Sequence, residues 1–285
     1  MSAADVVAAR YPRLARMVRG WTDEATRIGE QTQFYGRTIL SIGDALLRYK
    51  TETLRLIAQM GLGSGALAII GGAVAVVGFL TMMTGALVAV QGYNQLAAAS
   101  VEALTGFASA FFNVRLISPL TAAIALAATI GAGATAQLGA MRINEEIDAL
   151  EVMGIRSIAY LASTRVLAGV IVVVPLYCVA MLMSFVAARF GTTVIYGQSA
   201  GVYDHYFNTF LIPVDLIWSF FQAFSMAVVI MLVHTYYGYN AAGGPAGVGE
   251  AVGRAVRTSL VVSAVVILFV SLAIYGRSGN FNMAG

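Results

Sequence analysis

Long apolar runs dominate this sequence and constrain its fold more than any other feature. Runs at about residues 65–91, 113–138, 158–188, 214–236 and 260–275 are predicted as transmembrane helices, since about 20 apolar residues cross a bilayer. The runs are continuous and do not alternate apolar with polar residues, which disfavours a β-barrel. Only 11% of the 285 residues are charged, whereas about a quarter are charged in a soluble domain. The predicted fold class is all-α, a polytopic membrane protein with five transmembrane helices.

The stretch ahead of the first run is basic and then amphipathic. Residues 1–60 hold more than half of all Lys and Arg residues. Residues 1–33 are predicted as a basic cytoplasmic segment, and they lack the compact apolar region of a signal peptide. In residues 34–60, apolar side chains are separated by basic ones. This pattern predicts a helix lying in the membrane interface; an ordinary cytoplasmic helix is the alternative.

The basic residues also predict how the chain is oriented. Residues 94–112 contain no Lys or Arg, so this loop is predicted to face away from the cytoplasm. Arg142, Arg156 and Arg165 lie around the loop before the third run, which places that loop in the cytoplasm. With five spans, the N-terminus is predicted to be cytoplasmic and the C-terminus external, in the cell (inner) membrane.

Several kinds of chemistry find no support in the sequence. Cys178 is the only cysteine, and the two histidines, His205 and His234, lie on opposite sides of a predicted span. We therefore predict no metal site and no catalytic residues, and interpret His234 as a hydrogen-bonded residue near a helix end. Residues 243–249 are rich in glycine, but a phosphate-binding Walker A loop needs Gly-Lys before Ser or Thr. Lys50 is the only lysine and stands between Tyr and Thr. The chain therefore carries no ATPase or cofactor site of its own.

Residues 141–155 form a charged segment between two apolar runs. Read as one helix, the segment places Ile147 and Leu150 on one side and its acidic residues on another. Its carboxylates would be costly in hydrocarbon, so the segment is predicted to lie in water or against another protein. A solvated hairpin that only joins two spans is the alternative.

The same segment carries a specific sequence motif. Ala136, Gly139, Met141 and Arg142 precede the run Glu146, Ile147, Asp148, Ala149, Leu150, Glu151, Val152, Met153 and Gly154. This pattern resembles the coupling-helix motif of the MlaE/YrbE permeases, the membrane subunits of Mce-type lipid ABC transporters. Other matches to that family are Gln91-Gly92-Tyr93, the stretch from Arg115 to Pro119, and Gly238-Tyr239 followed by Ala246-Gly247-Val248-Gly249.

The resemblance implies an architecture and a function. It divides the chain into residues 1–33 and a permease domain, residues 34–285, in which residues 141–154 are a cytoplasmic coupling helix. The implied partners are a second permease subunit, a separate ABC ATPase dimer that binds ATP and Mg²⁺, and MCE-domain proteins, with a lipid as substrate. The residues implied in ATPase coupling are Arg142, Glu145, Glu146, Asp148, Glu151 and Met153. Those implied near the lipid pathway are Val88, Tyr93, Asn113, Arg115, Leu116 and Ile117.

The sequence also departs from the family pattern. Leu116, Thr129 and Gln137 stand where the family has charged residues. Charges at such positions are usually functional, so their loss suggests a diverged copy that pairs with a different permease, as in the actinobacterial YrbE proteins, where this chain would be the B-type half. A homodimer with an apolar pathway is the alternative. Arg115 is interpreted either as a ligand for an anionic headgroup or as an arginine reaching the external interface.

Two other functions are open on the sequence alone. An ion- or proton-coupled carrier would need Asp, Glu or His in relay within the membrane. Between residues 65 and 138 the only acid is Glu102, and Asp215 lies at a span end, so this function has little support. A scaffold that anchors partner proteins without transporting anything is the other possibility.

Overall fold

The computed structural model describes residues 26, 28–63 and 72–276, and all regular elements within them are helical. Five helical segments are long and apolar enough to cross a membrane: Gly72–Ala98, Glu102–Ile143, Ile158–Ile195, Pro213–Tyr239 and Gly244–Tyr275. The predicted fold class, an all-α polytopic membrane protein, is confirmed. Most of the predicted basic segment, the start of the first predicted span and the C-terminal tail lie outside the described residues.

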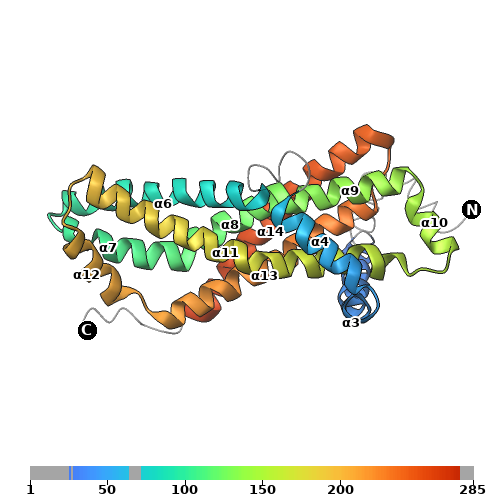
Figure 1. The fold of residues 1–285 in the computed structure, drawn as a ribbon, viewed down its shortest axis with the longest axis horizontal. Helices are drawn as coiled ribbons and strands as arrows, with labels where there is room; N and C mark the ends of the chain where they lie inside the picture. Colours follow the sequence, from blue (N-terminus) through green and yellow to red (C-terminus); the bar gives the residue numbers. More distant parts are fainter. Residues whose placement is uncertain (1–25, 27, 64–71, 277–285) are drawn as a thin grey trace, which may run out of the picture.

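The long helices form an elongated bundle around α11, Thr164–Phe190 (Figure 1). Helix α11 packs along α6, Gly72–Ala98, and also against α13, Pro213–Tyr239. Helix α14, Gly244–Tyr275, packs on α13 and on α9, Ala132–Ile143. Helices α3 and α10 lie at one end of the bundle, and α7 and α12 lie at the other (Figure 1).

The second span is one helix that changes its winding along its length. It comprises η1 (Glu102–Leu104), α7 (Thr105–Ala108), the π-helical η2 (Ser109–Ile117), α8 (Ser118–Leu126), the π-helical η3 (Ala127–Gly131) and α9. The wide turn of η2 ends where the Ser118 N–H donates to the Asn113 carbonyl, next to Pro119. Proline has no N–H to donate, and π-helical turns in membrane helices often occur at functional positions.

Helical structure extends further than hydropathy predicted. The second span was expected at 113–138 and the fifth at 260–275, yet they occupy 102–143 and 244–275. No helix was expected between the fourth and fifth predicted runs, but Gly243, with a left-handed φ of 90°, precedes the first residue of α14, and Pro245 lies in its first turn. Hydropathy failed here because Glu250 and Arg254 interrupt the apolar run, although they form an i,i+4 pair on the helix surface.

The predicted connecting segments are also more structured than expected. Residues 189–213, expected as a loop, contain η5 (Gly191–Ile195) and α12 (Ala200–Phe210). The expected interfacial helix at 34–60 is interrupted at Ser41, before α3 (Ile42–Leu47), and again at residues 48 and 49, before α4 (Lys50–Leu62). The side chains of Leu40 and Leu47 are exposed there, as a helix lying in a membrane interface requires.

Small and hydroxyl side chains fill the contacts between the spans. A Cβ at Gly85 of α6 would lie 2.3 Å from the Ser184 carbonyl oxygen of α11, so these backbones touch. Close approach of this kind drives helix association in membranes, where apolar burial from water is absent. Ser184 also hydrogen-bonds to Ser118 of α8 at 2.9 Å. Helices α6, α8 and α11 are therefore closely packed.

Large apolar side chains cover the outside of the spans. Exposed examples on four helices are Phe79, Leu87, Leu182, Val186, Phe190, Ile217, Phe221, Val261, Leu268, Phe269 and Leu272. A soluble protein rarely exposes so much contiguous apolar surface. The chain is therefore a multi-pass membrane protein whose outer face contacts lipid or other subunits.

The close approach of α6 and α11 gives a stability test. We expect Gly85→Ala to lower the free energy of unfolding by about 1–3 kcal/mol, because the added methyl group overpacks the contact. Gly133→Ala is the matched control, since a Cβ there meets no atom within 4 Å. Thermal unfolding in detergent measures both variants. Equal midpoints for the two would show that α6 and α11 do not approach as described.

Candidate functional site

A cavity of about 520 Å³ lies between α6 and the α7–η2 stretch of the second span. None of the side chains that line it carries a charge. They are Thr84, Leu87, Val88, Gln91, Gly92, Gln95, Leu96, Phe107, Ala108, Phe112 and Ile117. The cavity can hold part of an apolar molecule, because the atoms that face into it are apolar.

The residues predicted to lie near the lipid pathway have different surroundings in the structure. Val88 and Ile117 line the cavity. Tyr93 lies beside it and stacks on Tyr196 with ring centroids 4.3 Å apart. Asn113 is fully buried and donates to Ser109 at 3.2 Å, whereas Leu116 is exposed. The pathway itself stays a prediction for these residues.

Arg115 is held in an ion pair within the protein. Its Nε and one terminal nitrogen donate to the same oxygen of Asp215, at 3.0 and 2.6 Å. The rings of Phe111 and Tyr275 lie 4.3 and 4.7 Å from the guanidinium carbon, and such contacts stabilise a cation. The Arg115 charge is thus paired within the protein, and its roles as a headgroup ligand or as an arginine at the external interface stay predictions. Sequence reasoning had placed Asp215 only at a span end and missed the pair, whose partners are a hundred residues apart.

The charged segment at 141–155 is not one helix. Helix α9 ends at Ile143, Glu145 adopts a left-handed φ of 59°, and α10 runs from Glu146 to Val152. Arg142 and Asp148 join the two helices across this break through an ion pair of 2.6 Å. The periodicity that predicted a continuous helix ignored this reversal, because a single residue with positive φ leaves little trace in a sequence.

Helix α10 is anchored on one side and exposed on the other. Ile147 is fully buried and packs with Leu138 and Leu161. In contrast, Val152 is 89% exposed and Met153 66% exposed. Glu145 and Glu146 are exposed as well. The segment thus exposes two apolar side chains beside acidic ones. The exposure of Val152 was not predicted from the sequence.

Glu151 plays a different part from the other acids of the segment. Its carboxylate accepts hydrogen bonds from Ser157 at 2.6 Å and from Tyr239 at 3.1 Å. The Ser157 and Tyr239 hydroxyl oxygens lie 2.7 Å apart, so the two hydroxyl protons are shared among three close oxygens. Glu151 therefore connects the end of α10 with the start of the third span and with the end of α13. If Glu151 takes part in ATPase coupling as predicted, it would do so by holding the end of α10 in place.

His234 joins three helices inside the bundle. Its Nδ1 lies 2.7 Å from the Thr135 hydroxyl of α9, and its Nε2 lies 3.1 Å from the Ser259 hydroxyl of α14. A Cβ at Gly131 would lie 2.7 Å from the ring, so only glycine leaves room for it. The interpretation of His234 as a hydrogen-bonded residue agrees with these contacts. The described residues hold no group of three potential metal-binding side chains.

The opposite end of the bundle is closed by α12. A Cβ at Gly106 of α7 would lie 2.3 Å from the Tyr203 carbonyl oxygen, so α7 and α12 are in close contact. Arg189 donates two hydrogen bonds of 2.8 Å to Asp204. These bonds lower the pKa of Asp204 below its ordinary value. Helix α12 is thereby attached to both the second and the third spans near the cavity.

The described residues form a helical membrane bundle with an uncharged cavity and a charged, exposed turn at one end. The model of the family Permease MlaE matches residues 63–273, and the chain belongs to that family. A probable ABC transporter permease protein of Rickettsia bellii is 28% identical over 205 residues, or 69% of this chain and 74% of its own. A probable ABC transporter permease protein of Synechocystis is 25% identical over 166 residues, 58% of this chain and 63% of its own. The chloroplastic protein TRIGALACTOSYLDIACYLGLYCEROL 1 of Arabidopsis thaliana is 28% identical over 147 residues, 52% of this chain and 42% of its own.

The Arg115–Asp215 pair gives a test by double substitution. Asp215→Asn leaves a mostly buried cation unpaired, so we expect it to lower the free energy of unfolding by about 3 kcal/mol. Replacing both partners by apolar residues, Arg115→Met with Asp215→Leu, should restore much of that loss. Chemical unfolding in detergent compares the two. If the double variant is at least as unstable as Asp215→Asn, the cost does not come from an unpaired Arg115 charge.

Proposed function

We propose that this permease is the membrane subunit of an ATP-driven, Mce-type lipid transporter. One observation carries the proposal: α10 is fixed to α9 through the buried Ile147, yet it exposes Val152 and Met153 beside Glu145 and Glu146. Apolar side chains exposed among charges mark a surface that another protein covers. A separate ATPase docked there would move α10 and α9 together.

The ATPase belongs on another chain. The single lysine, Lys50, is followed by Thr but preceded by Tyr, so this sequence has no Walker A loop. ATP and Mg²⁺ would therefore bind to a partner ATPase dimer, and the relatives named as ABC transporter permeases support this division of labour. Arg142 and Asp148 would keep the turn rigid so that movement of the ATPase reaches the spans.

The cavity beside α6 supports a lipid as the substrate. Moving an acyl chain into water costs about 0.8 kcal/mol for each CH₂ group. A cavity without charges avoids this cost, and its lining fits an acyl chain better than an ion or a sugar. The name of the Arabidopsis relative is that of a glycolipid. Lipid would pass along α6, near Val88 and Ile117, towards MCE-domain partners outside the membrane.

A second, non-identical permease would complete the pathway. Thr129 and Gln137, which stand where the family has charges, line a second cavity of about 580 Å³ between α4, α6 and the second span. Leu116 is neutral as well, so this chain contributes few charges to the pathway. A partner permease that retains the charged residues would supply them. The subunit would lie in the cell (inner) membrane with α10 on the cytoplasmic side, the N-terminus inside and the C-terminus outside.

The exposed face of α10 gives the first functional test. We expect Glu145→Lys combined with Glu146→Lys to abolish co-purification of the ATPase and ATP-driven lipid transfer, because the charge of the docking surface is reversed. The variant should still insert and fold, since neither side chain is buried. Glu102→Lys, at the opposite end of the second span, is the control and should bind the ATPase normally.

A variant that binds the ATPase and transports at the wild-type rate would remove α10 from the docking surface. If the unsubstituted chain brings down partner proteins but moves no lipid, the chain is a scaffold. If it purifies alone and moves ions, it is a carrier.

The cavity gives a second functional test. We expect Leu87→Trp to lower lipid transfer about tenfold, or about 1.4 kcal/mol, because the indole ring fills the space that the lipid needs. Leu182→Trp is the matched control, an exposed leucine of α11 outside the cavity. ATPase association should be unchanged in both. Equal transfer by the two variants would place the lipid pathway elsewhere.

A further inference from the structure

A cavity with charged walls, of about 510 Å³, lies beside the end of α10. One wall is the helix over residues 28–40 with Ser41, and the other runs from the end of α10 to the start of the third span. The polar and charged side chains of the lining include Arg37 and Ser41 on the first wall and Glu151 and Arg156 on the second. Leu40 and other apolar residues line the rest. In contrast to the cavity beside α6, this one combines charged side chains with apolar ones.

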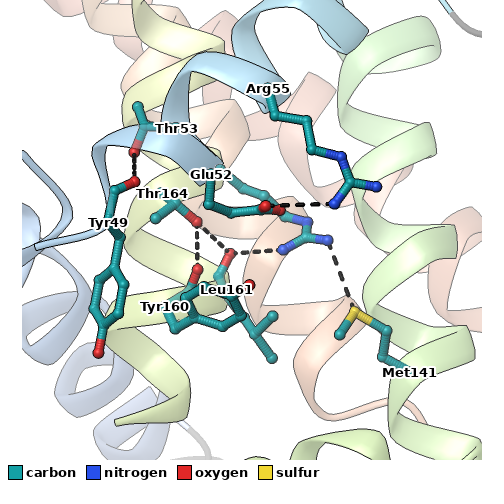
Figure 2. Close-up of polar contacts among 9 residues, drawn as sticks. Tyr49, Glu52, Thr53, Arg55, Met141, Tyr160, Leu161 and Thr164 are labelled. Atoms are coloured by element: carbon teal, nitrogen blue, oxygen red, sulfur yellow. Dashed lines mark hydrogen bonds and ion pairs between the residues drawn. The ribbon is translucent and has the colours of Figure 1, made fainter. Parts of the chain in front are cut away.

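The two walls of this cavity are attached to each other. The Ser163 hydroxyl, in η4 (Ile158–Ser163) of the third span, donates to the Thr38 carbonyl at 2.8 Å. Tyr49, whose carbonyl accepts a hydrogen bond from Thr53 of α4, packs its ring on Tyr160 with centroids 5.1 Å apart (Figure 2). A cavity whose walls are held in this way exists before a ligand binds, which lowers the cost of binding.

Arginines outnumber carboxylates around this cavity. The Arg37 side chain is exposed and makes no ion pair with another described residue. Arg156 pairs with Asp44 at 2.8 Å, and Asp44 also lies 3.7 Å from Arg48, so one carboxylate serves two arginines. The carboxylate in the lining, that of Glu151, already accepts hydrogen bonds from two hydroxyl groups. The cavity therefore attracts an anion, and Arg37 is free to bind it.

Exposed apolar side chains lie beside the arginines. Leu40 is 86% exposed although it lines the cavity, and Ile39 and Leu47 are exposed as well. Basic and apolar side chains exposed together are the pattern of a helix at a membrane surface, where arginines reach the headgroups. A guanidinium binds a phosphate group through two parallel hydrogen bonds. The lining therefore fits an anionic phospholipid better than a wholly polar anion.

We propose that this cavity binds the phosphate group of an anionic phospholipid from the leaflet on the α10 side, with Arg37 and Arg156 as the phosphate ligands. The Ser41 hydroxyl would donate a further hydrogen bond, and the acyl chains would lie along Leu40. The bound lipid would contact both the helix over residues 28–40 and the loop that follows α10, and would hold that loop against the membrane. This site is separate from the cavity beside α6, so the inference does not rest on the proposed function.

The test measures how a lipid protects the cavity from a thiol reagent. The full-length chain, with Leu40→Cys in a Cys178→Ala background because Cys178 is exposed, is purified in an uncharged detergent and labelled with a water-soluble maleimide. We expect dihexanoyl-phosphatidylglycerol to slow the labelling about tenfold, the effect of a ligand at about ten times its Kd. Zwitterionic dihexanoyl-phosphatidylcholine should have little effect. Leu54→Cys, exposed on α4 and outside the cavity, is the matched control and should label at the same rate with and without lipid.

Substitution of the arginines tests which groups hold the phosphate. We expect Arg37→Gln and Arg156→Gln each to raise the phosphatidylglycerol concentration needed for protection about tenfold, because each removes a charge-assisted contact. Both side chains are exposed, so the variants should fold. Arg48→Gln is the matched control: Arg48 is also an exposed partner of Asp44, but it does not line the cavity, and its variant should bind as the parent does.

Four outcomes would overturn the inference. Equal protection by phosphatidylcholine, or equal protection at Leu54→Cys, would show a general coat of lipid. Unchanged protection in both Arg37→Gln and Arg156→Gln would show that the arginines do not bind the phosphate. Protection by inorganic phosphate as strong as that by the lipid would assign the cavity to a soluble anion. A Leu40→Cys chain that does not label before lipid is added would show that protein covers the cavity.

Discussion

A charge in hydrocarbon is costly unless an opposite charge or hydrogen bonds accompany it, and this constraint organises the molecule. Most charged side chains of the described residues lie at or near the ends of the spans, as on α3 and α10 at one end of the bundle and on α12 at the other (Figure 1). Arg115 and Asp215 obey the same rule by forming a pair between the second span and α13. Arg165 is the exception, a buried cation with few acceptors among the described residues.

Close packing elsewhere determines where the cavity lies. Gly85 and the Ser118–Ser184 hydrogen bond hold α6, α8 and α11 together. Beyond that contact, the π-helical η2 widens the second span, and the space between it and α6 remains open. One face of α6 thus belongs to the rigid part of the bundle, while another lines the cavity. A lipid in the cavity would touch the same helix that packs most closely on α11.

Hydropathy and charge were enough to predict the helical class and the five spans, because bilayer thickness imposes a length that a sequence reveals. The bounds of α14 were missed, since Glu250 and Arg254 mask a helix that starts at Gly243. The break at Glu145 was missed because a single residue with positive φ leaves little trace in a sequence. The pairing of Arg115 with Asp215 could not be predicted from the sequence, because the two residues are far apart in the chain and only the folded bundle brings them together.

A cryo-EM map of the intact complex with its ATPase would test the central claim most directly, which is that residues 141–155 receive force from a separate ATPase. We expect the ATPase to cover Val152 and Met153, with basic side chains beside Glu145 and Glu146. A map in which this segment contacts only solvent, or lies on the side of the membrane opposite the ATPase, would contradict the claim.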